Sequence, residues 1–398
     1  MEHRDYTEIH VGTAVTRGIL DRLGSPDDAL KIIHIAGTNG KGTTAEFFTS
    51  ILVAAGKRTG TFTSPAVYDF YDQFKIDGKP IEAEVIEKYF DRAKTVSAGL
   101  DPTDFEIQTA GVILAFKEEG CEYAVIECGI GGLSDATNAI RRKELAVITS
   151  VSLEHTRYLG NTIGEICAQK AGIITGGCHA IINASQNAEA ESYFKNIGGQ
   201  FAGRVTCAYG ANFKKYRNVF WYCDREYELS FPGASHRVYD AATAIEGAKY
   251  LGLPEEAIRE GIKNARPRGR LEEFSAFGRQ YILDGAHNPE AFAPLKEYLA
   301  GTPRENITVI FGCLEDKDID GNLAALAPVA ENIIAVECDS PRRMPLNKIE
   351  KCCRKYFRNV SSAESVTHAL NSAFGKTVVV CGSFTLLKEA KLWIEQGQ

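Results

Sequence analysis

Near its N-terminus the chain reads Ile33-His-Ile-Ala-Gly-Thr-Asn-Gly-Lys-Gly-Thr-Thr44. This stretch begins as an apolar strand, passes through a glycine-rich loop that contains Lys41, and ends in hydroxyl side chains that open a helix. Such a loop lets backbone N–H groups close around phosphate oxygens, and the helix N-terminus adds a positive dipole. We expect Lys41 to reach the β- and γ-phosphates of a nucleoside triphosphate, with Thr43 or Thr44 holding Mg²⁺. Gly42 separates Lys41 from Thr43, which departs from the strict P-loop spacing, and an ordinary glycine-rich turn is the alternative.

Strand-like and helix-like segments alternate along most of the remaining chain. Apolar runs rich in β-branched residues are separated by amphipathic stretches, among them Thr43–Gly56 and Ile163–Ile173. Near-continuous apolar strands joined by helical crossovers are typical of parallel sheets that helices cover on both faces. The expected strands are Ile32–Ala36, Tyr123–Cys128, Leu145–Val151, Ala180–Asn183, Tyr281–Leu283, Thr308–Phe311, Asn332–Glu337 and Thr377–Cys381.

A domain boundary is indicated by the basic segment Ala265-Arg-Pro-Arg-Gly-Arg-Leu271, which follows the helical stretch Tyr239–Lys263. Because it contains Pro and Gly, we interpret it as a linker. The sequence therefore predicts an α/β protein: a P-loop parallel-sheet ATPase domain at residues 1–266, followed by a smaller Rossmann-like α/β domain at residues 267–398. Between about residues 200 and 235, short strands with turns predict an antiparallel appendage to the first domain.

The composition is that of a soluble globular protein. The chain has 398 residues, 44% of them apolar and 24% charged, with a net charge of −7 and a pI near 5.7. This mild acidity argues against a general nucleic-acid or membrane-surface function, because both need a basic face. Residues 1–10 lack the apolar core of a signal peptide, and no run of about 18 apolar residues predicts a membrane span. The 11 cysteines show no CxxC spacing, so we expect reduced, buried thiols in a cytoplasmic protein and no zinc site.

Two of the expected strands end in side chains that could bind a metal. Strand Tyr123–Cys128 carries Glu127 near its end, and strand Leu145–Val151 is followed by Glu154 and His155. In open α/β sheets, ligands bind beyond the carboxyl ends of the strands. A carboxylate and an imidazole at that place suit a Mg²⁺ ion that also contacts ATP phosphates. Taken singly, such residues are more often solvated or structural, but their position in a protein with a phosphate loop favours metal binding.

These features occur together in one family. The sequence resembles the Mur ligase superfamily and, within it, the folylpolyglutamate synthase/dihydrofolate synthase branch. The matching segments are collinear over roughly residues 18–390, and their shared order argues against chance. The segments are His34-Ile-Ala-Gly-Thr-Asn-Gly-Lys-Gly-Thr43, Thr63-Ser-Pro65, Ile76-Asp-Gly-Lys-Pro-Ile81, Glu127-Cys-Gly-Ile-Gly-Gly132, Asp135-Ala-Thr-Asn138, His155-Thr156, Leu159-Gly160, Lys170-Ala-Gly-Ile-Ile174, Gly269-Arg-Leu-Glu272, Asp284-Gly-Ala-His-Asn-Pro289 and Phe311-Gly-Cys-Leu-Glu-Asp-Lys-Asp318.

The resemblance implies an ATP-dependent amide ligase. In this family a substrate carboxylate attacks the γ-phosphate of ATP, and the amine of an amino acid then attacks the resulting acyl phosphate. For this branch the implied reaction joins L-glutamate to a (tetrahydro)folate, with ATP and two Mg²⁺ ions as cofactors. Family members are commonly monomers, so we expect a monomer whose partners are a small-molecule carboxylate and an amino acid, with no nucleic acid and no membrane.

The resemblance also assigns roles to single residues. Lys170 matches a lysine that CO₂ carbamylates, which would turn a poor metal ligand into an anionic oxygen ligand for a second Mg²⁺. Ser383 falls in the family's C-terminal Gly-Ser motif and receives no definite role. The expected catalytic residues are Lys41, Lys170 and His287; the nucleotide-binding residues are Gly37, Thr38, Asn39, Gly40, Lys41, Gly42 and Thr43, with Arg270 and Asp284 from the C-terminal domain; the Mg²⁺ ligands are Thr43, Ser64, Glu127, His155 and Lys170.

Departures from the family pattern gather on the substrate side. Ala66 stands where the family usually has His, and Leu133-Ser134 stands where it has Arg-Leu. Because these changes remove cationic or donor groups, the nucleotide machinery is expected to be intact and the carboxylate-substrate site altered. The other departures are Glu154 for Asp, Gln169 for Glu, and His236-Arg-Val-Tyr-Asp240 for a His-Gln-x-x-Asn segment.

Three functions stay open on this evidence. The first is an ATP-dependent ligase that adds L-glutamate to a folate, for which Tyr68, Phe70 and Tyr71 could supply an aromatic wall. The second is the same chemistry on a non-folate carboxylic acid. The third is a P-loop binding or regulatory protein without ligation, which would have no use for the Asp284 and His287 segment of a second domain.

Overall fold

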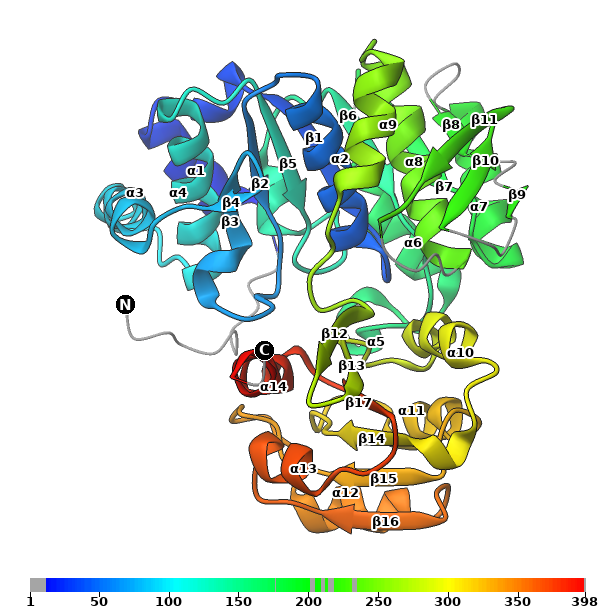
Figure 1. Ribbon diagram of the computed structural model, residues 1–398. Coiled ribbons are helices and arrows are strands. Elements are labelled where there is room, and N and C mark those ends of the chain that lie inside the picture. The colour runs from blue at the N-terminus through cyan, green and yellow to red at the C-terminus, as the bar shows by residue number, and fades with distance from the viewer. Residues whose placement is uncertain are drawn as a thin grey trace. The chain divides into compact units, whose positions relative to one another are not determined.

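The computed structural model describes residues 12–175, 177–200, 205–208, 212–213, 218–230 and 235–396. The chain forms two compact units: Met1–Pro65 with Tyr71–Arg266, and Ala66–Phe70 with Pro267–Gln398. Figure 1 shows the course of the chain through them. The change of unit after Arg266 falls within the segment that the sequence marks as a linker. The short segment Ala66–Phe70, which we expected in the first domain, belongs instead to the second unit.

The first unit is built around a largely parallel sheet. Over the described residues its strand order is β4-β3-β2-β5-β1-β6-β7-β8, in which β1 pairs in parallel with β5 and β6. This confirms the predicted α/β fold with a parallel sheet. The strands of this unit are β1 (Lys31–Ala36), β2 (Thr59–Phe62), β3 (Phe74–Ile76), β4 (Lys79–Pro80), β5 (Tyr123–Glu127), β6 (Leu145–Ile148), β7 (His179–Asn183), β8 (Val205–Ala208), β9 (Asn212–Phe213), β10 (Val219–Tyr222) and β11 (Arg225–Glu228).

Helices cover both faces of this sheet (Figure 1). On one face, α2, α8 and α9 bury a core with β1, β5, β6 and β7, which includes Ile33, Phe47 and Ile245. On the other face, α6 and α7 pack on β6 and β7 through residues such as Ile166 and Phe194. The helices are α1 (Ala14–Arg22), α2 (Lys41–Ala54), α3 (Ala83–Val96), α4 (Asp104–Glu118), α5 (Thr156–Leu159), α6 (Ile163–Ala171), α7 (Ala188–Gln200), α8 (Ser235–Tyr250) and α9 (Glu255–Asn264), with 3₁₀ turns η1 (Pro26–Ala29), η2 (Phe70–Gln73) and η3 (Ala136–Ala139).

Two local expectations need correction. The helical stretch Tyr239–Lys263 is not one helix, because Gly252 and Pro254 separate α8 from α9. The antiparallel appendage is present as the sheet β11-β10-β9, but β8 leaves it and extends the main sheet in parallel beside β7. Part of the appendage region lies outside the described residues.

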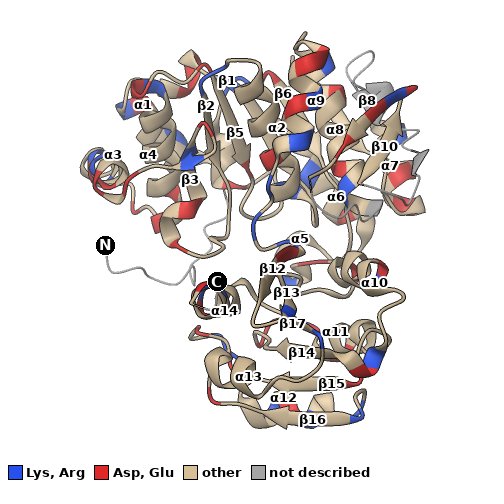
Figure 2. Cartoon of the chain, in the orientation of Figure 1, with Lys and Arg blue, Asp and Glu red and all other residues tan. Residues whose placement is uncertain are grey.

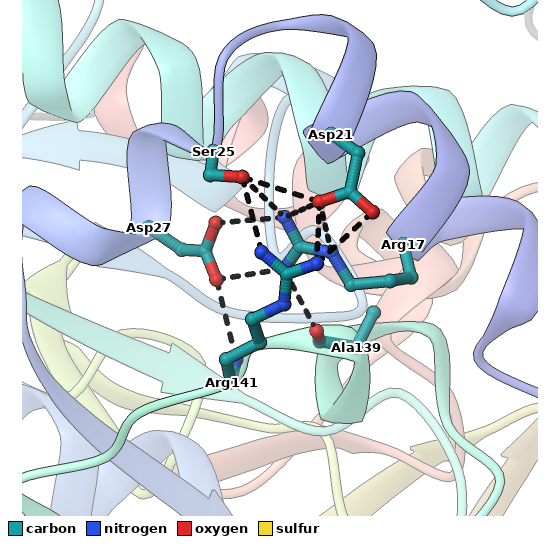
Figure 3. Close-up of polar contacts among 6 residues, drawn as sticks. All are labelled: Arg17, Asp21, Ser25, Asp27, Ala139 and Arg141. Atoms are coloured by element: carbon teal, nitrogen blue, oxygen red, sulfur yellow. Dashed lines mark hydrogen bonds and ion pairs between the residues drawn. The ribbon is translucent and has the colours of Figure 1, made fainter.

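An ion-pair cluster ties the first helix to the loop that follows η3 (Figure 3). Arg17 of α1 donates to Asp27 at 2.8 Å and to the Ala139 carbonyl at 3.1 Å, and Arg141 pairs with Asp21 at 2.8 Å. The Asp27 side chain is fully buried. Because a buried carboxylate needs its partners, the cluster stabilises the packing of α1 and η1 against the segment at Ala139 and Arg141.

The second unit contains its own sheet, with the order β12-β13-β17-β14-β15-β16 over the described residues. Strands β13, β17, β14, β15 and β16 run parallel, and β12 forms an antiparallel hairpin with β13. The elements are β12 (Glu272–Ala276), β13 (Arg279–Asp284), β14 (Ile307–Phe311), β15 (Asn332–Ala335), β16 (Asn359–Ser362), β17 (Thr377–Cys381), α10 (Ala293–Leu299), α11 (Ile319–Leu326), α12 (Leu346–Cys353), α13 (Val366–Ser372) and α14 (Leu387–Glu395), with η4 (Pro289–Phe292), η5 (Arg304–Asn306) and η6 (Phe384–Leu386).

The surface chemistry agrees with the composition. In Figure 2 both signs of charge are interspersed along the helices and loops, while the inner strands are mostly uncharged. None of the helices in the described part of the chain has the length and apolar character that a membrane span requires.

Candidate active site

The glycine-rich loop joins β1 to α2 and is pressed against the loop that follows β6. Thr38 N–H donates to the Ser150 carbonyl at 2.7 Å, and the Thr38 hydroxyl donates to the Ser152 carbonyl at 3.2 Å. A Cβ atom at Gly37 would overlap the Thr149 hydroxyl, so a side chain is excluded there. Gly40, with φ +89°, ends the loop in a left-handed conformation that favours glycine. The residues Gly37–Thr43 thus form a compact strand–loop–helix turn of the kind that cradles phosphate.

Lys41 is the first residue of α2 and faces a buried carboxylate. Its Nζ donates to the Thr38 carbonyl at 3.2 Å and lies 3.9 Å from Oε1 of Glu127, which is 2% exposed. The other oxygen of Glu127 accepts the backbone N–H of Ser64 at 3.3 Å. The structure therefore brings together three of the predicted residues, which come from α2, the end of β5 and the loop after β2.

Lys170 approaches the same loop from α6. Its side chain is almost fully buried, and its Nζ donates to the Gly37 carbonyl at 2.7 Å. Burial, and to a smaller extent the ammonium of Lys41, lower the pKa of Lys170 to about 8, against an opposing effect of Glu154. A lowered pKa increases the fraction of neutral amine at neutral pH, and the neutral amine is the form that reacts with CO₂.

His155 is less closely tied to this group. It adopts φ +49° just before α5, and its Nε2 lies 3.5 Å from Oε1 of Glu154. About a third of its side chain is exposed. The charge of Glu154, its neighbour, also acts on Lys170.

The oxygen donors near the loop suit a hard cation. The hydroxyls of Thr43 and Ser64 and the carboxylate of Glu127 are donors of the kind that Mg²⁺ prefers. The Thr44 hydroxyl, in the first turn of α2, is buried and has no hydrogen-bond partner within the described part of the chain. Among the described residues, no group of three or more His, Cys, Asp or Glu side chains could hold a metal ion. The candidate set is a mixture of hydroxyl and carboxylate oxygens that would be completed by phosphate and water.

In the second unit, Arg270 and His287 stand on neighbouring loops, and Asp284 ends β13 at the same edge of the sheet. Asp284 is buried; its two oxygens accept the backbone N–H groups of Leu271 at 2.9 Å and Ala286 at 2.8 Å. His287 Nδ1 lies 2.8 Å from the Gly285 carbonyl. Because a carbonyl oxygen only accepts, Nδ1 carries the proton, and the lone pair of the neutral ring is on Nε2.

Comparisons with known proteins agree with this arrangement. Residues 35–227 match the Mur ligase middle domain, and residues 269–384 match the Mur ligase, glutamate ligase domain. The dihydrofolate synthase/folylpolyglutamate synthase of Bacillus subtilis is 32% identical over 360 residues, which cover 83% of this chain and 82% of that protein. The Escherichia coli protein of the same name is 30% identical over 403 residues, covering 96% of this chain and 91% of that protein.

This chain belongs to the Mur ligase family. Its solved relatives include Escherichia coli FolC in complex with DHPP and ADP, at a TM-score of 0.88 and 28% identity, covering 99% of this chain and 96% of that one. A bifunctional folylpolyglutamate synthase/dihydrofolate synthase, with Mn, AMPPNP and L-glutamate bound, matches at a TM-score of 0.85 and 27% identity, covering 98% of this chain and 96% of that one. As a Mur ligase, the protein is an ATP-dependent ligase, and its two units correspond in order to the matched middle and glutamate ligase domains.

Two residues of this Mur ligase have places that the sequence alone did not reveal. Asp240 of α8 lies against the phosphate loop: a Cβ at Gly40 would be 2.5 Å from its Oδ1, which also accepts from Asn183 at 3.0 Å. Tyr68, which could supply part of an aromatic wall for substrate, belongs to the second unit and packs against its core. Its hydroxyl donates to Glu272 at 2.5 Å, and the Lys391 ammonium lies 4.2 Å from its ring centroid.

Proposed function

We propose that the protein joins L-glutamate to a folate at the expense of ATP. The observation that carries the proposal is the cluster around the phosphate loop, where Lys41 faces buried Glu127 and Lys170 contacts the Gly37 carbonyl. A regulatory nucleotide-binding protein needs only the loop and its lysine. A second buried lysine on the same loop is instead suited to a reaction in which negative charge accumulates at the γ-phosphate.

In the first half-reaction, a carboxylate oxygen of the substrate attacks the γ-phosphorus and the bond to ADP breaks. The acyl phosphate forms without any covalent bond to the protein. Lys41 and the N–H groups at the start of α2 stabilise the charge on the transferred phosphoryl group. When bound, Mg²⁺ supplies further positive charge at the phosphates, held by Thr43, Ser64 and Glu127. Lys170, carbamylated by CO₂, and His155 are the ligands we propose for a second ion.

In the second half-reaction, the amine of glutamate attacks the acyl carbon and inorganic phosphate leaves. The amine must lose a proton as the amide bond forms. We assign this proton to Nε2 of His287, because Nδ1 is committed to the Gly285 carbonyl. Arg270 and Asp284 complete the second unit's contribution: Arg270 as a cation for phosphate, and Asp284 as the group that holds the Leu271 and Ala286 backbone.

The test is a substrate panel with ADP release as the readout. The purified protein is incubated with ATP, Mg²⁺, L-glutamate and each of tetrahydrofolate, dihydropteroate and unrelated carboxylic acids, with each component omitted in turn. ADP release that requires both tetrahydrofolate and glutamate supports the proposal. Release that needs neither acid nor amine would contradict ligase chemistry.

A non-folate acid is the second candidate, and one observation favours it. Leu133 is 50% exposed and occupies a place where the family usually has arginine, so a cation for the acid substrate is missing there. In the same panel, turnover with another carboxylic acid and none with tetrahydrofolate would select this candidate.

A further inference from the structure

The segment Cys381-Gly-Ser-Phe384 received no definite role from the sequence, yet it meets the proposed catalytic loops of the second unit. Strands β13 and β17 are neighbours, with Asp284 opposite Cys381, so the loops that follow them leave the sheet side by side. Gly382 N–H donates to the Ala286 carbonyl at 2.9 Å. The chain after β17 is therefore fastened to the loop that carries His287.

A third segment joins at the same edge. Because β12 pairs antiparallel to β13, with Glu272 opposite Leu283, the residues just before β12 lie beside those just after β13. Gly285 N–H donates to the Gly269 carbonyl at 2.8 Å. Arg270 thus stands next to the His287 loop although 17 positions separate the two residues in the sequence.

The ring of Phe384 lies at the junction of these three segments. The Arg270 guanidinium carbon is 5.3 Å from its centroid, and the His287 ring centroid is 6.2 Å away at an interplanar angle of 60°. A Cβ at Gly285 would overlap the Phe384 ring, and one at Gly269 would lie 3.4 Å from it. Phe384 is 7% exposed, so its ring fills the space that Gly285 leaves open.

The rest of the segment directs Phe384 to this place. Gly382 has φ +101°, and a Cβ there would overlap the Gly312 carbonyl, so only glycine allows the turn. The Ser383 hydroxyl accepts the Thr385 N–H at 3.3 Å and so caps the short turn η6 in which Phe384 is the first residue. Gly382 and Ser383 therefore both serve to place the side chain of Phe384.

We propose that Phe384 is a positioning residue that holds Arg270 and His287 in a fixed relation to each other. The inference rests on the proposed function of those two residues and goes beyond it, since Phe384 itself touches no reacting atom. The guanidinium is attracted to the electron-rich face of the ring, and the His287 loop can approach only because Gly285 lacks a side chain. Loss of the ring should leave both groups in place on average and poorly aligned, which lowers kcat more than it changes KM.

The first experiment is a double-mutant cycle with ATP, tetrahydrofolate and L-glutamate. Phe384→Leu keeps an apolar side chain, and we expect it to lower kcat about tenfold. In a His287→Ala background the same change should lower kcat by clearly less than tenfold, because only the part of the effect that acts through Arg270 remains. If Phe384→Leu does not fold, Phe384→Met fills the same space with a flexible chain and takes its place.

The matched control is Phe357→Leu. Phe357 is also 7% exposed and lies in the same unit, but it stands between α12 and β16, at the opposite edge of the sheet from β12. Phe357→Leu should lower the melting temperature about as much as Phe384→Leu does, and its kcat should stay within about twofold of the wild-type value. An effect of Phe384→Leu on kcat that persists in full in the His287→Ala background, as independent effects do, would overturn the inference.

The second experiment does not depend on turnover. In spectra of protein with ¹³C-labelled histidine, His287→Gln identifies the His287 ring signal. Phe384→Leu should move that signal, because the ring current of Phe384 is lost, and Phe357→Leu should leave it in place. If the wild-type protein shows no folate-dependent ADP release, the proposed function fails while this measurement still decides the inference. An unmoved His287 signal in Phe384→Leu would refute it.

Discussion

The two groups of candidate residues are held in opposite ways. In the first unit, Lys170 and Glu127 are buried ionisable groups whose partners are loop backbone atoms and the neighbouring Lys41. In the second unit, Arg270 and His287 are partly exposed and stand on loops beside one aromatic ring. The first arrangement places charge where little water can screen it, whereas the second places side chains by packing. Substitutions in the first unit should therefore act through charge, and substitutions in the second through alignment.

The largest loss of turnover is expected for Lys41→Ala. This change removes the cation that begins α2, and groups of this kind contribute on the order of 10²–10³-fold in rate. ADP release under saturating Mg²⁺ measures the loss. Lys75→Ala is the control, since that lysine is also largely buried in the first unit and pairs with Glu46 at 3.4 Å. If Lys41→Ala retains more than half of the wild-type turnover, the glycine-rich loop is not the ATP-binding site.

Lys170 tests whether a buried lysine acts as a cation or as a carbamate. Lys170→Arg keeps the positive charge and cannot form the carbamate, so we expect a loss of about 10²-fold. Lys170→Ala should lose activity as well, but added formate could enter the gap and restore part of it. Wild-type activity in Lys170→Arg, or a Lys170→Ala variant indifferent to formate, would count against the carbamate.

Glu127→Gln and His155→Ala should raise the Mg²⁺ concentration needed for half-maximal turnover. Loss of one ligand from a site with several weakens affinity first, by roughly tenfold or more. We expect the larger shift for Glu127→Gln, because the Glu127 side chain is 2% exposed and lies 3.9 Å from Lys41, whereas the His155 side chain is 32% exposed. If turnover depends on Mg²⁺ concentration in the same way in both variants and in the wild type, Glu127 and His155 are not Mg²⁺ ligands.

Asp284→Asn tests whether turnover depends on the alignment of the Arg270 and His287 loops in the second unit. The carboxylate accepts from two backbone N–H groups, at 2.9 Å and 2.8 Å, with a different oxygen for each. An amide has only one oxygen to accept with, so one N–H loses its partner and stability should fall by about 1–2 kcal/mol. We expect kcat to fall about tenfold, because the Arg270 and His287 loops shift. A variant that loses stability but retains full kcat would show that alignment here does not control the rate.

The smallest effect on turnover is expected for Lys143, a buried lysine without a proposed role in catalysis. Its Nζ donates to Asn138 at 2.5 Å and to the Ile173 carbonyl at 3.0 Å, and burial lowers its pKa to about 8. The unfolded chain keeps this proton up to a pKa near 10.5, so between these values the unfolded state binds more protons and stability rises with pH. A shift of this size corresponds to roughly 3 kcal/mol, a cost present in full below pH 8 and lost as the pH approaches 10.5.

Lys143→Met removes this titration. The difference in unfolding free energy between wild type and Lys143→Met, measured by denaturant between pH 7 and pH 10.5, should change in favour of the wild type as the pH rises. A difference that is flat with pH would mean that Lys143 keeps its ordinary pKa in the folded protein.

The chain itself determined the parallel α/β core and the phosphate loop, because apolar strand runs, helix periods and a glycine-rich turn are local patterns. Local motifs made Lys41 and Glu127 candidates, and the family resemblance added Lys170. The sequence could not show that Lys170 contacts Gly37, that Tyr68 packs with Glu272, or that Phe384 meets Arg270 and His287. Those contacts join positions from 97 to 204 residues apart, or loops whose neighbours depend on strand order. Only the tertiary structure decides them, because strand order and burial arise from the packing of the whole sheet and leave no local periodicity to read.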